Sequence, residues 1–274
     1  YLPAQSIIYQ LISDIRNWHA GERDWRETRK KIEVKYGYDK YGGNCHMVPN
    51  QGLIIHAILH AEDDFSEALK IVNTSGWDTD CNSGNVGCFM GIKLGLKGID
   101  ASLEKGVDWR GPVADQMYMP TAEGGRVITD CATEAVELIR LGKTLAGENY
   151  LYPKDGAQFH FEFPGSVQGF QLDSAVSNTE CKVFNAKGHS RHGTRSLCAQ
   201  KGKGICAISS PVFTPSLEIA EHFKGYGYSL MAVPRLYSGQ MLRSGLQTAA
   251  SNSATIEVSL AYQYYGDADQ QSWI

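Results

Sequence analysis

Several features that would narrow the function are scarce in this sequence. No hydrophobic run is long enough to cross a membrane as a helix, and no secretory signal is present. The net charge of −4 gives no electrostatic footprint for nucleic acid or an anionic membrane, so neither is expected as a partner. None of the seven cysteines forms a Cys-x-x-Cys pair. Because the chain opens at Tyr1 without Met, a missing signal excludes no compartment, and the localisation stays open.

The composition is that of an ordinary globular chain, and its patterning changes midway. With 274 residues, 42% of them hydrophobic, the chain is long enough for two cores. Helix-spaced apolar residues and capping signals predict these helices: 5–20, 24–36, 50–61, 64–75, 82–95 and 129–147. After residue 157, short alternating runs at 159–163 and 255–262, separated by turns, predict a β-sandwich. We therefore predict a multi-domain chain: an all-α bundle over 1–147, a linker over 148–156 and an all-β sandwich over 157–274.

The most informative run is GWDTDCNSGNVG at residues 76–87. Asp78 and Asp80 stand one residue apart between two predicted helices, with Thr79 and Asn82 as further oxygen donors. Hard cations such as Mg²⁺ prefer several oxygens from one compact turn. An EF-hand loop is excluded, because it needs Gly and Glu at the positions held here by Ser83 and Phe89. Helix capping by the two aspartates is the alternative explanation, since Asp is favoured at helix N-termini.

The run resembles the C-terminal metal motif of the ADP-ribosylglycohydrolase family. Other segments resemble the family in the same order: DWRETR at 24–29, CHMVPNQGL at 45–53, EDDFSEAL at 62–69 and WRGP at 109–112. The resemblance covers residues 1–147 and implies an all-α, ADP-ribosylglycohydrolase-like bundle. It also implies two Mg²⁺ ions beside the ribose of ADP-ribose, with Mn²⁺ or Ca²⁺ as substitutes. Carried over to this sequence, Asp78 and Asp80 become metal ligands.

The sequence departs from the family pattern in two places. Cys81 stands where many members have a Ser or Thr hydroxyl, and a thiol is a poor ligand for Mg²⁺. The family's upstream Gly-Asp and Thr-Asp-Asp motifs do not occur in residues 1–60, while Gly266-Asp267 lies in a strand-like context and is interpreted as a turn. We therefore expect this chain to be part of a longer protein, a bundle that is partial and carries half of a metal site. No catalytic acid can be named.

The reaction that the resemblance implies is hydrolysis at C1″ of an ADP-ribose adduct, through an oxocarbenium-like ribose. Four residues near the metal turn are candidates for substrate binding: His46, Asn50, Trp77 and Asn85. His46 could equally be a hydrogen-bonded residue before a helix, and Trp77 could pack beside the site or stack on a base. His56 and His60 have a spacing that can bind Zn²⁺, but no third ligand accompanies them.

The second half resembles a galactose-binding-like jelly roll more weakly, through FPGSVQGF at 163–170 and HGTRSL at 192–197. This resemblance implies a carbohydrate ligand, although a structural cap or a dimer contact fits a sandwich equally well. Cys181, Cys198 and Cys206 permit one disulfide, whose pairing is not deducible. Two functions remain as alternatives to an ADP-ribosyl hydrolase: a glycoside or nucleoside hydrolase acting on a sugar conjugate, and an inactive binding homologue.

Overall fold

The structure is a computed structural model of the 274-residue chain. It describes residues 2–43, 45–119, 126–213, 234–249, 251–261, 263–265 and 271–273. The chain divides into two compact units, residues 1–236 and 237–274. The predicted linker at 148–156 lies inside the first unit, and the predicted domain division stays a prediction.

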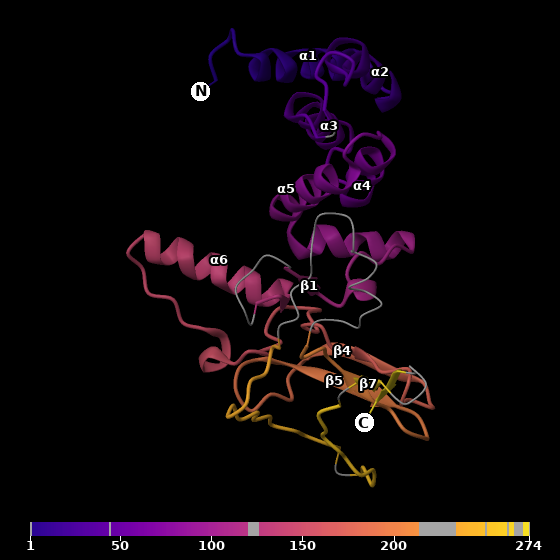
Figure 1. Cartoon of the computed structure of the whole chain (residues 1–274), viewed down its shortest axis with the longest axis vertical. Coiled ribbons are helices and arrows are strands. Elements are labelled where there is room, and N and C mark those ends of the chain that lie inside the picture. The colour runs from indigo at the N-terminus through magenta and orange to yellow at the C-terminus, as the bar shows by residue number, and fades with distance from the viewer. Residues whose placement is uncertain are drawn as a thin grey trace. The chain divides into compact units, whose positions relative to one another are not determined.

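Five helices precede the first strand of unit 1 (Figure 1). Their bounds are α1 Ile7–Gly21, α2 Trp25–Tyr36, α3 Met47–His60, α4 Phe65–Thr74 and α5 Thr79–Asp100. Ser6, Asp24 and Asp64 begin α1, α2 and α4, because each side chain accepts a hydrogen bond from a backbone N–H of the first turn. A sixth helix, α6 (Cys131–Leu145), is capped in the same way by Asp130.

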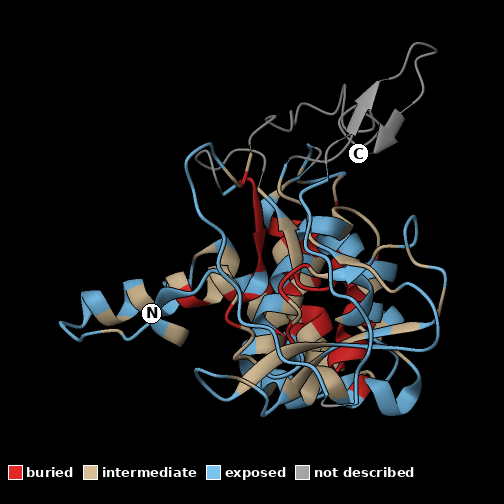
Figure 2. Ribbon diagram, turned by 90° about the horizontal axis from the view of Figure 1, so that it is seen from below, coloured by how far each residue is buried: buried red, intermediate tan, exposed pale blue. Residues whose placement is uncertain are grey.

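Two apolar clusters hold the first five helices together. In one, Leu11 and Ile15 of α1 pack with Ile32 of α2 and Leu53 of α3. The other joins α3, α4 and α5 through residues that include Ala57, Phe65, Val72, Val86 and Met90. Helix α3 therefore lies between the two clusters and contributes to both. Figure 2 colours these buried residues red. Gly52 permits this packing, since a Cβ there would lie 3.3 Å from Ile32 Cγ2 and 3.4 Å from Leu11 Cδ1.

The predicted helices are confirmed with shifted ends. Helix α3 begins at Met47 rather than Asn50, because His46 already caps it. Helix α5 begins at Thr79 and is interrupted at Gly95, whose φ of +64° is outside the helical region, close to the predicted end. The segment 98–127, predicted as loop with helical turns, contains the short helices η1 (Ala101–Lys105) and η2 (Gly111–Val113) and the strand β1 (Gln116–Tyr118).

The strands of the described residues form four two-stranded antiparallel sheets, and no closed jelly roll is seen among them. Strand β1 pairs with β2 (Ile128–Asp130), and β3 (Gln171–Leu172) pairs with β6 (Ile208–Ser209). The longest ladder joins β4 (Cys181–Lys187) to β5 (Arg195–Lys201), with Phe184 opposite Cys198. In unit 2, β7 (Gln263–Tyr265) pairs with β8 (Gln271–Trp273).

The two strands proposed from alternating sequence are wrong. Residues 159–163 form no strand; Phe159 and Phe161 instead pack their rings on Phe170. Residues 255–261 lack strand structure and are exposed, and the last residue of that prediction, Tyr262, lies outside the described part of the chain. The Gly266-Asp267 turn also lies outside it. Alternation failed here because it records only side-chain polarity, whereas a strand needs a partner for its backbone.

Buried and partly buried hydrogen bonds connect the helical region to the later segment of unit 1. The side chain of Asp115 accepts from Val167 N at 2.9 Å, and Gly169 N donates to Ala114 O at 2.7 Å. The fully buried Asp130 accepts from Gln168 Nε2 at 3.2 Å and pairs with Arg235 at 3.3 Å. These contacts place the linker, which contains the short helix η3 (Pro153–Gly156), within one compact unit.

The disulfide whose pairing the sequence left open joins Cys181 to Cys206. Cys198 is free. None of the helices in the described residues is long and apolar enough to cross a bilayer.

Candidate functional site

The acidic turn between α4 and α5 has an unusual backbone. Gly76 and Trp77 both have positive φ, at +81° and +60°. Gly tolerates this conformation, but a bulky residue such as Trp in it is an outlier. Such strain costs on the order of 1–3 kcal/mol and is found where surrounding contacts enforce it. Here the ring of Trp77 stacks on Tyr38 at 5.1 Å, with the Arg29 guanidinium 4.0 Å from its centroid.

Asp78 occupies the N-cap position of α5, yet its side chain makes no capping hydrogen bond. The Oδ2 atom instead accepts from the Cys45 thiol at 2.8 Å and from Asn50 Nδ2 at 3.0 Å. Asp64 and Asp130, by contrast, accept from the third residue of their helices. The capping explanation therefore does not account for Asp78, whose carboxylate is directed toward the segment before α3.

Asn50 holds Asp78 in this orientation. It is 8% exposed, and its Oδ1 accepts from the Tyr38 hydroxyl at 2.7 Å while its Nδ2 donates to Asp78. Both ends of the amide are thus engaged within the protein. The structure makes Asn50 a positioning residue for Asp78, and its predicted contact with substrate stays a prediction.

Two thiols surround the same carboxylate. The ligand atoms of Cys45, Asp78 and Cys81 all lie within 4.8 Å of one another. Hydrogen bonds from Cys45 and then Cys81 lower the pKa of Asp78. The same interaction with Asp78 raises the pKa of the Cys45 thiol to about 11 and also raises the pKa of Cys81. The carboxylate is thus stabilised in its charged form and both thiols in their protonated form.

The remaining predicted residues of the turn differ in accessibility. Asp80 is exposed in the first turn of α5, and hydrogen bonding to it also lowers the pKa of Asp78. Thr79 is half-buried. Asn82 is 1% exposed, and its Nδ2 has no hydrogen-bond partner. This burial turns Asn82 away from solvent, so it is a weak candidate for a metal ligand.

Two other candidates for substrate binding are engaged in local contacts. His46 Nδ1 accepts from Val48 N at 3.2 Å and so caps α3. Asn85 is exposed and donates to the Cys81 carbonyl one turn earlier, at 2.9 Å. Beside it, Gly84 has open space around the position of a Cβ, while a Cβ at Gly87 would touch Leu69. Sequence reasoning did not anticipate Cys45 at this site, although it stands directly before His46.

Asp78 and Asp80 fit part of a Mg²⁺ site. Magnesium is commonly held by one or two carboxylates and keeps several waters. The two thiols fit this ion poorly, because thiolates favour softer metals. Among the residues that the structure describes, Cys45, Asp78 and Cys81 are the only group of three or more His, Cys, Asp or Glu ligands close enough to share one ion.

The spacing of His56 and His60 on α3 does not create a metal site: His56 lies in the core and His60 is half-buried. His56 is fully buried, and the centroid of its ring lies 5.0 Å from that of His60. The ring of His19 in turn contacts the ring of His60. Burial, reinforced by His60 and Arg29, lowers the pKa of His56 to about 3. His56 is therefore neutral at physiological pH, and neither of its ring nitrogens has a hydrogen-bond partner.

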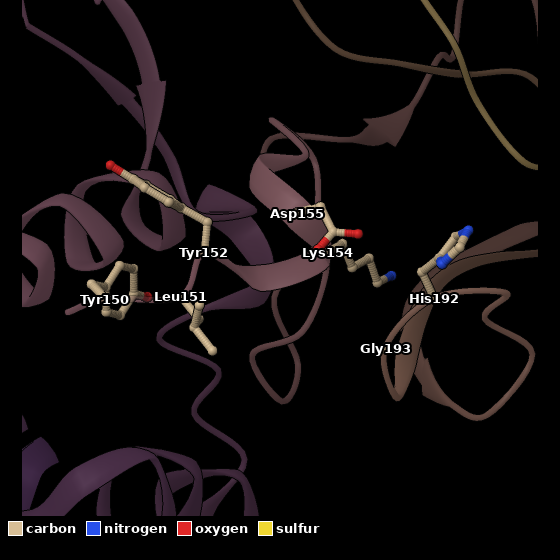
Figure 3. Close-up of a pocket in the computed structure, with 7 residues that line it drawn as sticks. All are labelled: Tyr150, Leu151, Tyr152, Lys154, Asp155, His192 and Gly193. Carbon is tan, nitrogen blue, oxygen red and sulfur yellow. The ribbon is translucent and has the colours of Figure 1, made fainter.

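Two open hollows lie on unit 1. One, of about 480 Å³, borders the acidic turn and is lined by Glu33, Val34, Tyr38, Asp39, Lys40 and Trp77. The other, of about 570 Å³, is lined by residues 150–152, Lys154, Asp155, His192 and Gly193. Figure 3 shows Lys154 extending toward the loop that carries His192 and Gly193. That hollow shares no residue with the acidic turn.

The helical fold and the Asp78 turn define a helical protein with a candidate cation-binding site. The sequence model of the ADP-ribosylglycohydrolase family matches residues 2–142, just over half of the chain, and the chain belongs to this family. Neither the comparison with curated proteins nor that with solved structures found a match. The matched segment contains α1–α5 and most of α6, and it includes Asp78 and Asp80. The galactose-binding-like character of residues 157–274 stays a prediction.

Proposed function

We propose that this chain carries part of the active site of a metal-dependent hydrolase that releases ADP-ribose from its adducts. Family membership supports the reaction class. The single observation that carries the assignment to this turn is the Asp78 carboxylate, which occupies a helix N-cap without capping it and is held by Cys45 and Asn50.

In this proposal Asp78 and Asp80 hold Mg²⁺. The other ligands come from the family's Gly-Asp and Thr-Asp-Asp motifs, which do not occur in residues 1–60. When bound, the ion orients the ribose diol and lowers the pKa of a bound water. Asn50 fixes the direction of the Asp78 carboxylate, and Tyr38 in turn fixes the Asn50 amide. The depressed pKa of Asp78 keeps it charged and ready to accept a cation. The helix dipole of α5 also favours the negative charge of the Asp78 carboxylate at the N-terminus of this helix.

The experiment measures release of ADP-ribose from ADP-ribosylated peptides by the natural full-length protein, with Mg²⁺ and with a chelator. We expect release that needs Mg²⁺ and is abolished by Asp78→Asn, because the amide removes the charge but keeps the shape. Asp63→Asn is the matched control, since Asp63 is an exposed aspartate that pairs with Lys93 on the surface. Turnover unchanged in Asp78→Asn would contradict the metal assignment. No release by folded, Mg²⁺-loaded protein would favour an inactive binding homologue.

A second candidate function is carbohydrate recognition at the hollow that includes Tyr150, Tyr152, Asp155 and His192. Aromatic faces combined with a few polar groups are typical of small-molecule sites. This arrangement favours the alternative of a hydrolase acting on a sugar conjugate. Titration with galactose and with oligosaccharides, followed by NMR, tests it. Tyr152→Ala should abolish the shifts and the control Tyr237→Ala, in unit 2, should not; shifts that survive Tyr152→Ala would exclude this hollow.

A further inference from the structure

Two thiols and one carboxylate converge at the acidic turn from segments that are distant in sequence. Cys45 precedes α3, whereas Asp78 and Cys81 belong to the start of α5. The family comparison assigns no role to either thiol. Their proximity is built by the protein, because α3 and α5 pack against each other through the cluster that contains Ala57, Val86 and Met90.

We propose that Cys45, Cys81 and Asp78 form a binding site for Zn²⁺ or a similar thiophilic divalent cation. Zinc takes cysteine sulfur at about 2.3 Å and carboxylate oxygen at about 2.0–2.2 Å. Tetrahedral ligands at those lengths lie roughly 3.5–3.8 Å apart. The three ligand atoms here already lie within 4.8 Å of one another, so small rotations of the two exposed cysteine side chains bring them to the required spacing.

The donor set selects the metal. Two sulfurs and one oxygen suit zinc far better than Mg²⁺, whose ligands are oxygens. On binding, each thiol transfers its proton to solvent, so the ion is held by two thiolates and one carboxylate. Three protein ligands leave a fourth tetrahedral position for water.

The surroundings also support a metal ligand at Asp78. Asn50 Nδ2 donates to the Asp78 carboxylate and fixes its orientation, as hydrogen-bonding partners do at other metal sites. Both thiols are exposed, so an ion can reach them from solvent. Cys88, further along α5, is also exposed but lies outside the cluster. Cys88 is therefore an exposed thiol that is not expected to bind the ion.

The test is zinc binding by the 274-residue chain, measured by competition with a chromophoric chelator. It is run without reductant, and a thiol count of five free cysteines checks that Cys181–Cys206 is intact. We expect one tight Zn²⁺ per chain. Cys45→Ser and Cys81→Ser should each weaken binding by at least about tenfold, since loss even of an outer partner costs that much. Cys88→Ser, the matched control, should leave the affinity unchanged.

Cobalt provides a readout that needs no variant. The Co²⁺-loaded chain should show the near-ultraviolet charge-transfer absorption of thiolate ligands, and Cys45→Ser and Cys81→Ser should each reduce it. A loss of affinity in only one of the two cysteine variants, or in neither, would overturn the three-ligand site. A Co²⁺ spectrum without thiolate absorption would overturn it as well. The zinc site and the proposed Mg²⁺ site share the Asp78 carboxylate, so the two ions would compete for it. Zinc binding is measured by affinity and by the Co²⁺ spectrum, whereas the hydrolase proposal is measured by release of ADP-ribose, so failure of one proposal is distinguishable from failure of the other.

Discussion

The helical region and the segment from Ala157 to Phe213 bury different kinds of side chain. In the described residues, every buried hydrophobic side chain lies between Leu11 and Val136. Between Ala157 and Phe213 the buried side chains are polar: His160, Ser166 and Gln168. Fully buried apolar packing thus stabilises the helices. The later segment is held by hydrogen bonds, an ion pair, a disulfide and the half-buried rings of Phe159, Phe161 and Phe170. The acidic turn belongs to the apolar-packed region, where α3 and α5 have little freedom to separate.

The largest expected effect comes from removing Asp130, whose buried carboxylate accepts from Gln168 of the later segment and pairs with Arg235. Asp130→Ala removes the α6 cap and leaves the buried Arg235 without its ion-pair partner. Removing one member of a buried pair costs about 3–5 kcal/mol of unfolding free energy. Urea unfolding of Asp130→Ala and of the unmodified chain measures this loss of unfolding free energy. Asp63→Ala, which removes a surface partner of Lys93, should change stability by less than about 1 kcal/mol. Equal effects of the two variants would contradict the buried role of Asp130.

The Cys181–Cys206 disulfide should stabilise only the later segment against unfolding. It closes a loop across a sequence separation of 25, and loss of such a loop constraint costs about 3 kcal/mol. Hydrogen exchange of the Cys181→Ser/Cys206→Ser variant should therefore lose protection in β4 and β5 and keep it in α3 and α5. Cys198→Ser, in the same hairpin, is the control and should alter neither. Loss of protection in the helices would mean that the two regions unfold together.

Lowering the pH should reduce the unfolding free energy of the helical region, because His56 binds a proton more readily in the unfolded chain. Its pKa is lowered to about 3 by burial, whereas an unfolded histidine binds a proton below about 6.5. The unfolded state therefore holds more protons between these values, and stability falls as the pH drops through this window. From pH 7 to pH 5 the loss is about 2 kcal/mol. Urea midpoints at the two pH values measure it.

The histidine origin of that loss can be checked by substitution. His56→Met, similar in size and without charge, should reduce the pH dependence, while His60 and His160, whose pKa values are also lowered by burial, keep a smaller part. Replacing the exposed His192 with Met should leave the full dependence. An undiminished dependence in His56→Met would show that His56 is protonated in the folded protein.

The smallest expected effect concerns the site itself. Asn50→Ala removes the hydrogen bonds to Asp78 and from Tyr38, and a bond to a charged group contributes about 1.5 kcal/mol. Unfolding in urea should show a loss of that order. Asn85→Ala, which removes only an exposed bond to the Cys81 carbonyl, should change stability by less than about 0.5 kcal/mol. If Asn50→Ala were equally neutral, Asn50 would not hold Asp78.

The sequence predicted the helices well because their signals are local. Asp24, Asp64 and the spacing of apolar residues specify where a helix starts and which face it buries. The strands were predicted poorly, since pairing depends on a distant segment. The alternating run at 255–261 found no partner in the described residues, while β4 and β5 paired across a turn.

For the site, local sequence was enough to identify the acidic turn: Asp78 and Asp80 are separated only by Thr79, and they lie in the segment that matches the family. The side chains that surround that turn come from helix packing. Cys45 and Asn50 reach Asp78 because α3 packs on α5, a contact between residues 28 or more positions apart that no local pattern encodes. Packing likewise buried Asn82 and His56, two residues whose spacing suggested ligands. Side-chain type and spacing specify which atoms can bind a metal, and only the packing of helices determines which of them meet and remain accessible.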